Sequence, residues 1–406
     1  DAIFLLLYFQ HAGTEVVMGT FRNVSQSEPC PICGKPDWCS ILKPSMESYP
    51  GEELYVCRRI QQNTISTNGI TYTFIKELND GSSLYAIKKD KVFSHKSINR
   101  EVKERPAEPK VSYPKLKDTE SLDSIYRSFL QLLPLSARHF HKLSCDGWPE
   151  TLIKQSLIRS VSFKRSYDSE KGHYSDASER VRLTKRLVDQ YGPLDGVPGF
   201  YQDESGNWTF SGRDGMLIPI YDLHKKLYRL RLRLDKPPLD ENGKERNKYK
   251  NFSSYHCEKD DSGNLANAYS HGSRAGSCIG LYCHPETDNL SICYITEGEK
   301  KALLANNMLK CPVISLPGTG TYKKVYEDYD GINVISYLKS ISCTTIVVAY
   351  DADKIFNQQV KRYEKKLTDI LLAESFTVFT ADWNIGFGKG IDDILPLGIF
   401  PTLKPV

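Results

Sequence analysis

The sequence lacks long apolar runs, a strong excess of one charge and the phosphate-binding loop of ATPases. It holds no stretch of about 20 apolar residues, the length that crosses a bilayer, so we expect no membrane span. The net charge is only +4 over 406 residues, so composition permits a nucleic-acid partner without requiring one. The pattern G-x4-G-K-[ST] is absent, which argues against an ATP-driven motor.

Cysteine is present, but not in the pattern of a secreted, disulfide-bonded domain. The eleven cysteines are an odd number spread over the whole chain, and we find no signal peptide. We therefore expect a cytoplasmic protein with reduced thiols. The apolar run from Ile3 to Phe9 is too short to span a membrane, and we set residues 1–18 aside as a leader or an added terminal segment.

Changes in composition along the chain predict three folded parts. Residues 19–95 hold four cysteines among short alternating segments, which indicate a small β-rich, zinc-binding module. Lys, Glu, Pro and Ser dominate residues 96–118, the composition of an exposed linker. Residues 119–290 mix helical and strand-like segments with the densest basic run, which predicts a basic α+β subdomain. Residues 291–406 form the expected C-terminal domain.

Strand-like and helix-like segments alternate in this C-terminal domain. The expected strands are 291–295, 313–315, 344–350 and 376–380, and the expected helices are 299–308, 330–339 and 357–373. This alternation is typical of a parallel α/β sheet. Together with the preceding parts, it predicts a multidomain protein of mixed α/β and α+β class.

One segment of the basic subdomain alternates strictly. From Leu227 to Leu234, every second residue is apolar, and the intervening positions include Arg229, Arg231 and Arg233. Alternate side chains of a strand point to opposite faces, so the pattern predicts a β-strand with one basic face. Such a face suits phosphate groups, and the alternative is an ordinary solvated face.

Four of the cysteines have the spacing of a zinc ribbon. Cys30 and Cys33 form a C-x2-C pair, and Cys39 and Cys57 follow where a returning strand can bring them back to it. Four thiolates in this arrangement predict a structural zinc site. The alternative is that these are ordinary buried or free thiols.

Carboxylates follow two of the expected strands. Glu297 follows the first strand, and Asp351 and Asp353 follow the third strand two residues apart, so that both can face one ion. A later turn holds Asp392 and Asp393. Open α/β sheets bind ligands at the carboxyl ends of their strands, so these residues predict a Mg²⁺ or Mn²⁺ site for phosphoryl transfer. The alternative is that they are solvated or helix-capping groups.

These carboxylates do not stand alone, because further recognisable segments surround them. Arg213 to Asp222 is similar to R-[DN]-x-[VI]-x-F-P-I-x-D, and Lys248 to Ser253 is similar to K-Y-x-N-S. Gly388 to Asp393 is similar to G-K-D-P-D-E, with Gly390 where an acidic residue often stands. With Glu297-Gly and Asp351-Ala-Asp, these segments resemble the toprim domain and, more narrowly, DnaG-type primases of phage or plasmid kind with an N-terminal zinc ribbon.

The resemblance implies a DNA primase, a DNA-directed RNA polymerase that makes short RNA primers on single-stranded DNA from ribonucleoside triphosphates. Two-metal nucleotidyl transfer would place Mg²⁺ or Mn²⁺ on Asp351, Asp353 and Asp392, with Asp393 a further candidate. Glu297 would be a ligand or an acid–base group, and Trp38 a stacking surface for template bases or part of the ribbon core. A separate replicative helicase is the implied partner. Residues expected to contact nucleic acid or nucleotide are Arg213, Arg231, Arg233, Lys248, Lys250 and Lys300.

Two other functions fit the same residues. A toprim-type nuclease or topoisomerase would use the same carboxylates to cleave DNA. A non-catalytic zinc-ribbon protein would bind single-stranded DNA during replication without incorporating nucleotides. Carboxylates held close repel one another unless a cation lies between them, which favours a catalytic site over a decayed one.

Overall fold

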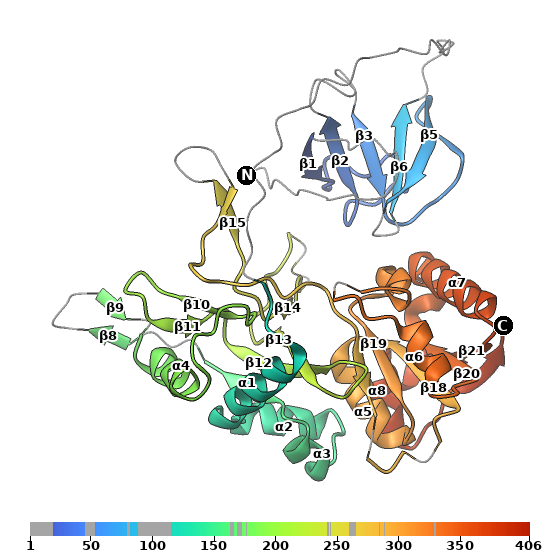
Figure 1. Ribbon diagram of the computed structural model, residues 1–406. Coiled ribbons are helices and arrows are strands. Elements are labelled where there is room, and N and C mark those ends of the chain that lie inside the picture. The colour runs from blue at the N-terminus through green and yellow to red at the C-terminus, as the bar shows by residue number, and fades with distance from the viewer. Residues whose placement is uncertain are drawn as a thin grey trace, which may run out of the picture. The chain divides into compact units, whose positions relative to one another are not determined.

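The chain folds into two compact units in a computed structural model (Figure 1). One contains residues 1–104 with 354–363, and the other contains residues 105–353 with 364–406. The expected leader at 1–18 and most of the expected linker at 96–118 lie outside the described residues. Within the described part of the chain, no helix is long and apolar enough to cross a membrane. The structure describes residues 19–44, 53–78, 82–87, 115–162, 166–168, 173–175, 177–241, 243, 245–259, 265–283, 285–287, 289–328 and 330–406.

The first unit is built on an antiparallel sheet of six strands in the order β1-β2-β3-β6-β5-β4. Tyr85 is fully buried, and its hydroxyl donates to the Ile60 carbonyl oxygen at 3.1 Å. The rings of Tyr55 and Tyr72 pack edge to face with centroids 5.1 Å apart. This unit is therefore the small β-rich module that the sequence predicts. Its strands are β1 (Gly19–Asn23), β2 (Ser40–Pro44), β3 (Leu54–Cys57), β4 (Thr64–Thr67), β5 (Ile70–Glu77) and β6 (Ser83–Ile87).

An aromatic core supports the first half of the second unit. Phe129, Phe200, Phe210 and Phe252 pack together with ring centroids 5.0 to 6.3 Å apart. Helices α1 and α4 and a sheet in the order β14-β13-β12-β7 pack around them, whereas the buried side chains of α2 and α3 join the core shared with the C-terminal sheet. The helices are α1 (Thr119–Leu132), α2 (Ala137–Cys145), α3 (Glu150–Gln155) and α4 (Ala177–Tyr191). The sheet strands are β7 (Arg159–Val161), β12 (Gly215–Tyr221), β13 (Leu227–Leu234) and β14 (Tyr249–Asn251).

Three two-stranded ribbons accompany this half of the unit. Each pairs neighbouring strands in antiparallel register, which a short connection allows. The pairs are β8 (Ser166–Asp168) with β9 (His173–Ser175), β10 (Phe200–Gln202) with β11 (Trp208–Phe210), and β15 (Cys257–Lys259) with β16 (Leu265–Asn267).

The second half of this unit carries a six-stranded sheet in the order β17-β19-β18-β20-β21-β22. The four inner strands are parallel, and the two outer strands run antiparallel to them. This confirms the α/β arrangement expected from the alternating pattern. The strands are β17 (Gly280–Tyr282), β18 (Ile292–Glu297), β19 (Val313–Leu316), β20 (Thr345–Ala349), β21 (Thr377–Asp382) and β22 (Thr402–Pro405). The helices along this part of the chain are α5 (Glu299–Leu309), α6 (Val334–Ser340), α7 (Gln358–Ala373) and α8 (Ile391–Ile394), with 3-10 turns η1 (Thr319–Val325), η2 (Ala352–Ile355), η3 (Ile385–Phe387) and η4 (Leu395–Leu397). Residues 354–363, which include the end of η2 and the start of α7, are grouped with the first unit.

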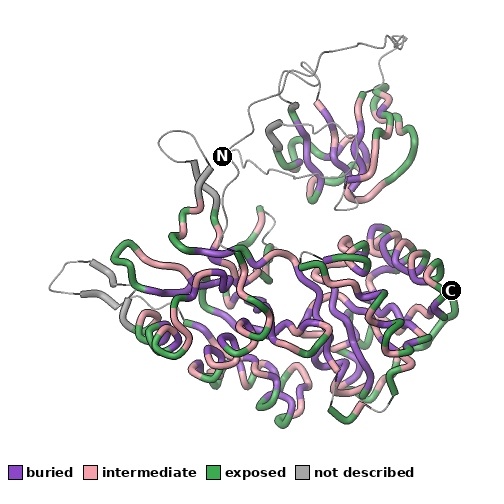
Figure 2. The backbone as a smooth tube through the Cα atoms, in the orientation of Figure 1, coloured by how far each residue is buried: buried purple, intermediate pink, exposed green. Residues whose placement is uncertain are grey.

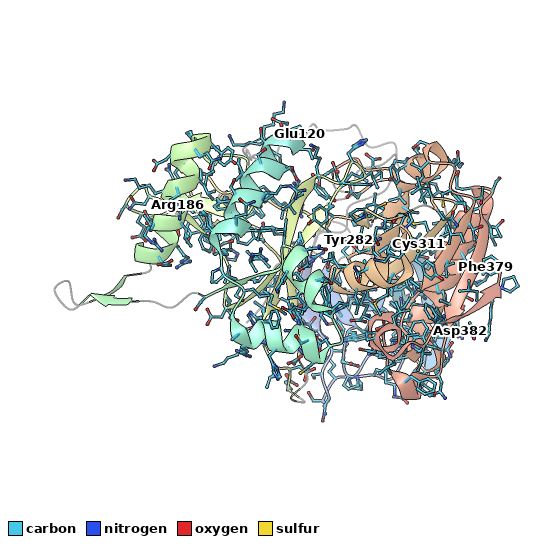
Figure 3. All side chains as sticks on the ribbon, turned by 90° about the horizontal axis from the view of Figure 1, so that it is seen from below. Glu120, Arg186, Tyr282, Cys311, Phe379 and Asp382 are labelled. Atoms are coloured by element: carbon cyan, nitrogen blue, oxygen red, sulfur yellow. The ribbon has the colours of Figure 1, made fainter. Side chains whose placement is uncertain are left out.

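The two larger sheets of the second unit share one apolar core. Ile218 of β12, Leu304 of α5 and Val347 of β20 belong to the same cluster of fully buried side chains, and Figure 2 shows buried backbone running through both sheets. Tyr282 of β17 lies between the sheets (Figure 3), and its hydroxyl donates to the Pro219 carbonyl oxygen of β12 at 2.9 Å. This packing holds the C-terminal sheet in a fixed position against the basic sheet.

Strand β13 differs from its expected form. Its alternation is as predicted, but Arg229 and Arg231 are only 2% and 7% exposed. Arg229 pairs with Asp330, and Arg231 pairs with Glu299. These ion pairs correct the expectation of an open basic face, because only Arg233 of the three arginines remains partly exposed.

Candidate active site and cysteine cluster

The four cysteines of the predicted zinc site lie together in the first unit. One sulfur atom from each of Cys30, Cys33, Cys39 and Cys57 lies within 4.8 Å of the others, so the group can hold a metal ion. A tight turn presents the first pair: the Gly34 N–H donates to the Cys30 carbonyl oxygen at 2.7 Å, and Gly34 has a φ of 70°. The donor set, four thiols, is that of a structural zinc site.

Hydrogen bonds to sulfur surround this cluster. The backbone N–H groups of Arg59 and Ile60 both donate to Cys57 Sγ at 3.4 Å. The Arg59 guanidinium lies 3.9 Å from Cys33 Sγ and 3.8 Å from Cys39 Sγ, and it pairs with Asp37. Hydrogen bonding from Cys30 first, then Cys39 and Cys57, lowers the pKa of the Cys33 thiol. The same hydrogen bonds raise the pKa of the Cys30 and Cys39 thiols, so within the protein alone the thiolate form is favoured at Cys33 and Cys57.

Trp38 lies at the surface of this unit rather than in its core. Its side chain is 42% exposed, and its backbone has a φ of 66°, in the left-handed region that few non-glycine residues adopt. Arg59 lies over its ring at 5.1 Å from the centroid. Of the two sequence interpretations of Trp38, this position fits the stacking surface.

The second candidate site lies at the carboxyl edge of the parallel sheet. Strands β18 and β20 are direct neighbours, so Glu297 and Asp351 emerge at the same edge. The Thr296 hydroxyl donates to the Ala349 carbonyl oxygen at 3.0 Å and ties the two strand ends together. Gly298, with a φ of 87°, then turns the chain into α5.

The loop that holds Asp392 and Asp393 completes this edge. It is attached through the Ala352 N–H, which donates to the Lys389 carbonyl oxygen at 2.9 Å. Asp393 accepts the Gly390 N–H at 2.8 Å and caps α8. Asp392 interacts electrostatically with Lys301, Lys300 and Asp351. Of the two aspartates, Asp392 is therefore the one that faces the other carboxylates.

Three lysines lie among these carboxylates, and two were not singled out from the sequence. The Lys301 Nζ donates to Asp351 Oδ1, and the Lys389 Nζ lies 2.9 Å from Asp353 Oδ2 and 3.4 Å from Asp351 Oδ2. Lys301 lies in the expected helix 299–308 and Lys389 in the Gly388 to Asp393 segment, but the aspartates they contact lie 36 to 50 positions away in the sequence. Helix α5 and the 388–390 loop bring them to the edge.

Burial and neighbouring charges change the pKa values of the carboxyl groups and of Lys301 in this site. Burial raises the pKa of Glu297 and of Asp392 above the usual carboxyl range. Burial also opposes the charge of Lys301, but Asp351, then Glu297 and Asp392, outweigh that effect and raise the Lys301 pKa. The site therefore favours bound cations.

One carboxylate oxygen of this site is available to bind a divalent ion. Asp353 Oδ1 is buried and has no hydrogen-bond partner among the described residues. An unpartnered carboxylate oxygen inside a protein is costly, and Mg²⁺ or Mn²⁺ would supply its missing partner. In the described residues, however, no three carboxylates of this edge bring ligand atoms within 4.8 Å of one another, because lysines lie between them.

The residues predicted to contact nucleic acid occupy different environments. Arg231 is buried and holds Glu299 Oε1 with two nitrogens, at 3.0 and 2.6 Å. The Lys300 Nζ lies 2.8 Å from Asp146 Oδ2 and 3.8 Å from Asp392 Oδ2. Arg213 and Lys250 are exposed, Arg233 is partly exposed, and Lys248 pairs with Glu245 at 2.8 Å. The open positive charge is thus carried by Arg213, Arg233 and Lys250.

The side chains of a second cluster of possible metal ligands make hydrogen bonds and an ion pair within the protein. Cys278, Asp328 and Asp330 lie close enough to hold an ion. However, Asp328 accepts the N–H groups of Asp330 and Ile332 at 2.8 and 3.0 Å and that of Ile279 at 3.1 Å. Asp330 neutralises Arg229. These contacts hold the backbone of Ile279, Asp330 and Ile332 to Asp328, so the cluster has a structural role.

Comparison with known proteins gives one family and several structures. A family described as a domain of unknown function (DUF3854) matches residues 283–397. No curated protein matches the chain. The chain is similar in structure to the zinc-binding and RNA polymerase domains of the Aquifex aeolicus primase, with 12% identity and a TM-score of 0.44 over 71% of this chain and 63% of that one.

Two further structures belong to the same kind of enzyme. The RNA polymerase domain of Mycobacterium tuberculosis primase DnaG, in complex with a double-stranded DNA oligomer with an overhang, has 10% identity and a TM-score of 0.43 over 69% of this chain and 77% of that one. A DNA primase domain from Pseudomonas aeruginosa has 12% identity and a TM-score of 0.41 over 70% and 79%. At these identities, function has to be argued from the residues of the site.

Proposed function

We propose that this chain is a DnaG-type primase with a toprim domain, which makes short RNA primers on single-stranded DNA by nucleotidyl transfer. The observation that carries the proposal is the set Glu297, Asp351, Asp353 and Asp392 at one edge of a parallel sheet, with an unpartnered buried oxygen on Asp353. Such a carboxylate edge suits phosphoryl transfer at a divalent cation. A four-cysteine module in the same chain supports a template-binding role.

The carboxylates would hold Mg²⁺ or Mn²⁺, which neutralises the phosphates of an incoming ribonucleoside triphosphate. Asp351 and Asp353 hold their place through η2 and the strand-end bond of Thr296. Lys389 is 59% exposed at its side chain, so it can leave the aspartates and contact phosphate when nucleotide enters. Glu297 would bind the ion or move a proton at the attacking hydroxyl.

The nucleic-acid path would lie on the open part of the basic sheet. Arg233 is directly opposite Tyr249 in the β13–β14 pair, and Tyr249 is 42% exposed. The next pair on the same face of the sheet is Arg231 with Asn251, and Arg231 reaches Glu299 beside the carboxylate edge. A cation and an aromatic ring on one sheet face suit a single strand that runs toward the metal site.

The cysteine module would be a structural zinc ribbon. Zinc would be held by Cys30, Cys33, Cys39 and Cys57, and the exposed Trp38 ring would stack on a template base. A separate replicative helicase would deliver the single strand.

Primer synthesis tests this function directly. Single-stranded DNA, the four ribonucleoside triphosphates and Mn²⁺ should yield short RNA on a denaturing gel. Asp353→Asn should lower the yield about 100-fold, because it weakens the cation site. Asp369→Asn is the matched control, since Asp369 is an exposed aspartate of α7 paired only with Lys365 in the described contacts, and it should leave synthesis unchanged.

Two outcomes would redirect the assignment. Cleavage of supercoiled plasmid without RNA synthesis would favour a toprim nuclease or topoisomerase. Binding of single-stranded DNA by both wild type and Asp353→Asn, with no incorporation by either, would favour a non-catalytic replication protein.

A further inference from the structure

Lys301 is placed differently from Lys389, the exposed lysine of the carboxylate edge. It lies in the first turn of α5, and its ammonium donates to Asp351 Oδ1. It also interacts with Glu297 and Asp392, so carboxylates from three separate segments share it. Its side chain is 23% exposed, against 59% for Lys389. Lys389 can therefore swing into solvent, whereas Lys301 is held inside.

The space that Lys301 occupies is made by a glycine. A Cβ on Gly390 would lie 3.1 Å from the Lys301 Cε and 2.3 Å from Asp392 Oδ1. Gly390 has a φ of −95°, which any residue adopts, so the backbone conformation does not require glycine here. The requirement is room: the end of the Lys301 side chain and the Asp392 carboxylate fill the place that a side chain at position 390 would take.

We propose that Lys301 is a built-in cation of this site, and that the site consequently takes a single divalent ion. The ammonium already occupies Asp351 Oδ1, which leaves Asp351 Oδ2 and the unpartnered Asp353 Oδ1 for one ion after Lys389 moves away. The inference deepens the proposed function, since it assigns one of two expected metal positions to a side chain.

Charge supports one ion rather than two. Glu297, Asp351, Asp353 and Asp392 bring at most four negative charges, and Lys301 contributes one positive charge. One divalent ion leaves one excess negative charge, whereas two ions would leave one excess positive charge in a site where the Lys300 Nζ also lies 3.8 Å from Asp392 Oδ2. In a partly buried site, such an excess is unfavourable because water screens it poorly.

Counting bound Mn²⁺ on the zinc-loaded protein tests this directly, by electron paramagnetic resonance without nucleotide. Ions that Asp353→Asn loses belong to the carboxylate site. The wild type should therefore bind one Mn²⁺ more than Asp353→Asn does. Lys301→Met keeps the length of the side chain without its charge, and it should bind Mn²⁺ about tenfold more tightly or take up a second ion, because the competing cation is gone.

The control is the same substitution at an exposed position. Lys365→Met on α7, where the side chain is 75% exposed, should keep one ion at the wild-type affinity. Two site-specific ions in the wild type, no site-specific ion, or an unchanged Lys301→Met titration would each overturn the inference. A single ion without any primer synthesis would leave it standing and instead refute the proposed function.

Discussion

The buried ion pair between Arg231 and Glu299 gives the sharpest test of how the second unit is held together. Arg231 comes from the basic sheet and Glu299 from the start of α5, and the two side chains are only 8% and 3% exposed. The Arg231 guanidinium also donates to the Asn251 side chain. Arg231→Met keeps much of the side-chain volume but removes both interactions.

The expected cost follows from what remains behind. Glu299 would be a carboxylate without its cation in a buried position, and removing one member of a buried pair costs about 3–5 kcal/mol. Replacing both residues, as in Arg231→Met with Glu299→Met, removes the uncompensated charge and should cost less than the single substitution. The exposed pair of Arg182 with Glu179, with side chains 62% and 67% exposed, sets the lower limit: Arg182→Met should cost about 1 kcal/mol or less.

Urea unfolding followed by tryptophan fluorescence measures these differences. Trp148, Trp208 and Trp383, three of the four tryptophans, lie in the second unit, so the signal mainly reports its unfolding. Arg231→Met should lower the urea midpoint by about 1 M at an unchanged slope. A midpoint equal to that of Arg182→Met, or a double variant less stable than the single one, would refute the assignment of a stabilising buried pair.

Three further predictions concern the two candidate sites. Chelation of zinc, or Cys57→Ser, should unfold the first unit and leave the urea transition of the second, as measured by zinc content and by Trp38 fluorescence. Because burial raises the pKa of Glu297 and of Asp392, both protonate on mild acidification before ordinary carboxylates do, and the Mn²⁺ affinity should then fall. The metal-free protein should instead become more stable on the same acidification, because it no longer buries these two charges. Mn²⁺ titrations and urea unfolding at several pH values measure the two effects. Lys250→Met should weaken single-stranded DNA binding for every sequence and reduce the salt slope by about 0.7.

Local patterns in the sequence predict most of the backbone. Helix α1 begins after Asp118, which caps it by accepting the Ser121 N–H at 2.8 Å, and it ends before Pro134. The predicted helix at 299–308 is α5 at Glu299–Leu309, and the predicted strand at 344–350 is β20 at Thr345–Ala349. These elements follow from spacing and capping over a few residues, which a sequence displays directly.

The environments of charged side chains were less accessible to sequence reasoning. Arg231 stands in an alternating strand whose other face is apolar, so an exposed basic face was the natural prediction. Its partner Glu299 lies 68 residues later, and Asp330 lies 101 residues after Arg229. A strand with exposed arginines and a strand whose arginines are buried in ion pairs have the same alternating sequence. Only the tertiary packing distinguishes them.

The segment from Glu297 to Lys301 shows why a motif is more than a set of ligands. Glu297 and Lys301 face the expected ion site, whereas Glu299 and Lys300 hold separate parts of the second unit in place. Because α5 turns about 100° per residue, consecutive side chains point in different directions and reach different partners. These partners are Arg231 for Glu299, Asp146 for Lys300 and Asp351 for Lys301. A substitution at Glu299 or Lys300 should therefore alter the position of Glu297 as well as its own contact, so a loss of metal affinity at either position does not by itself identify a ligand.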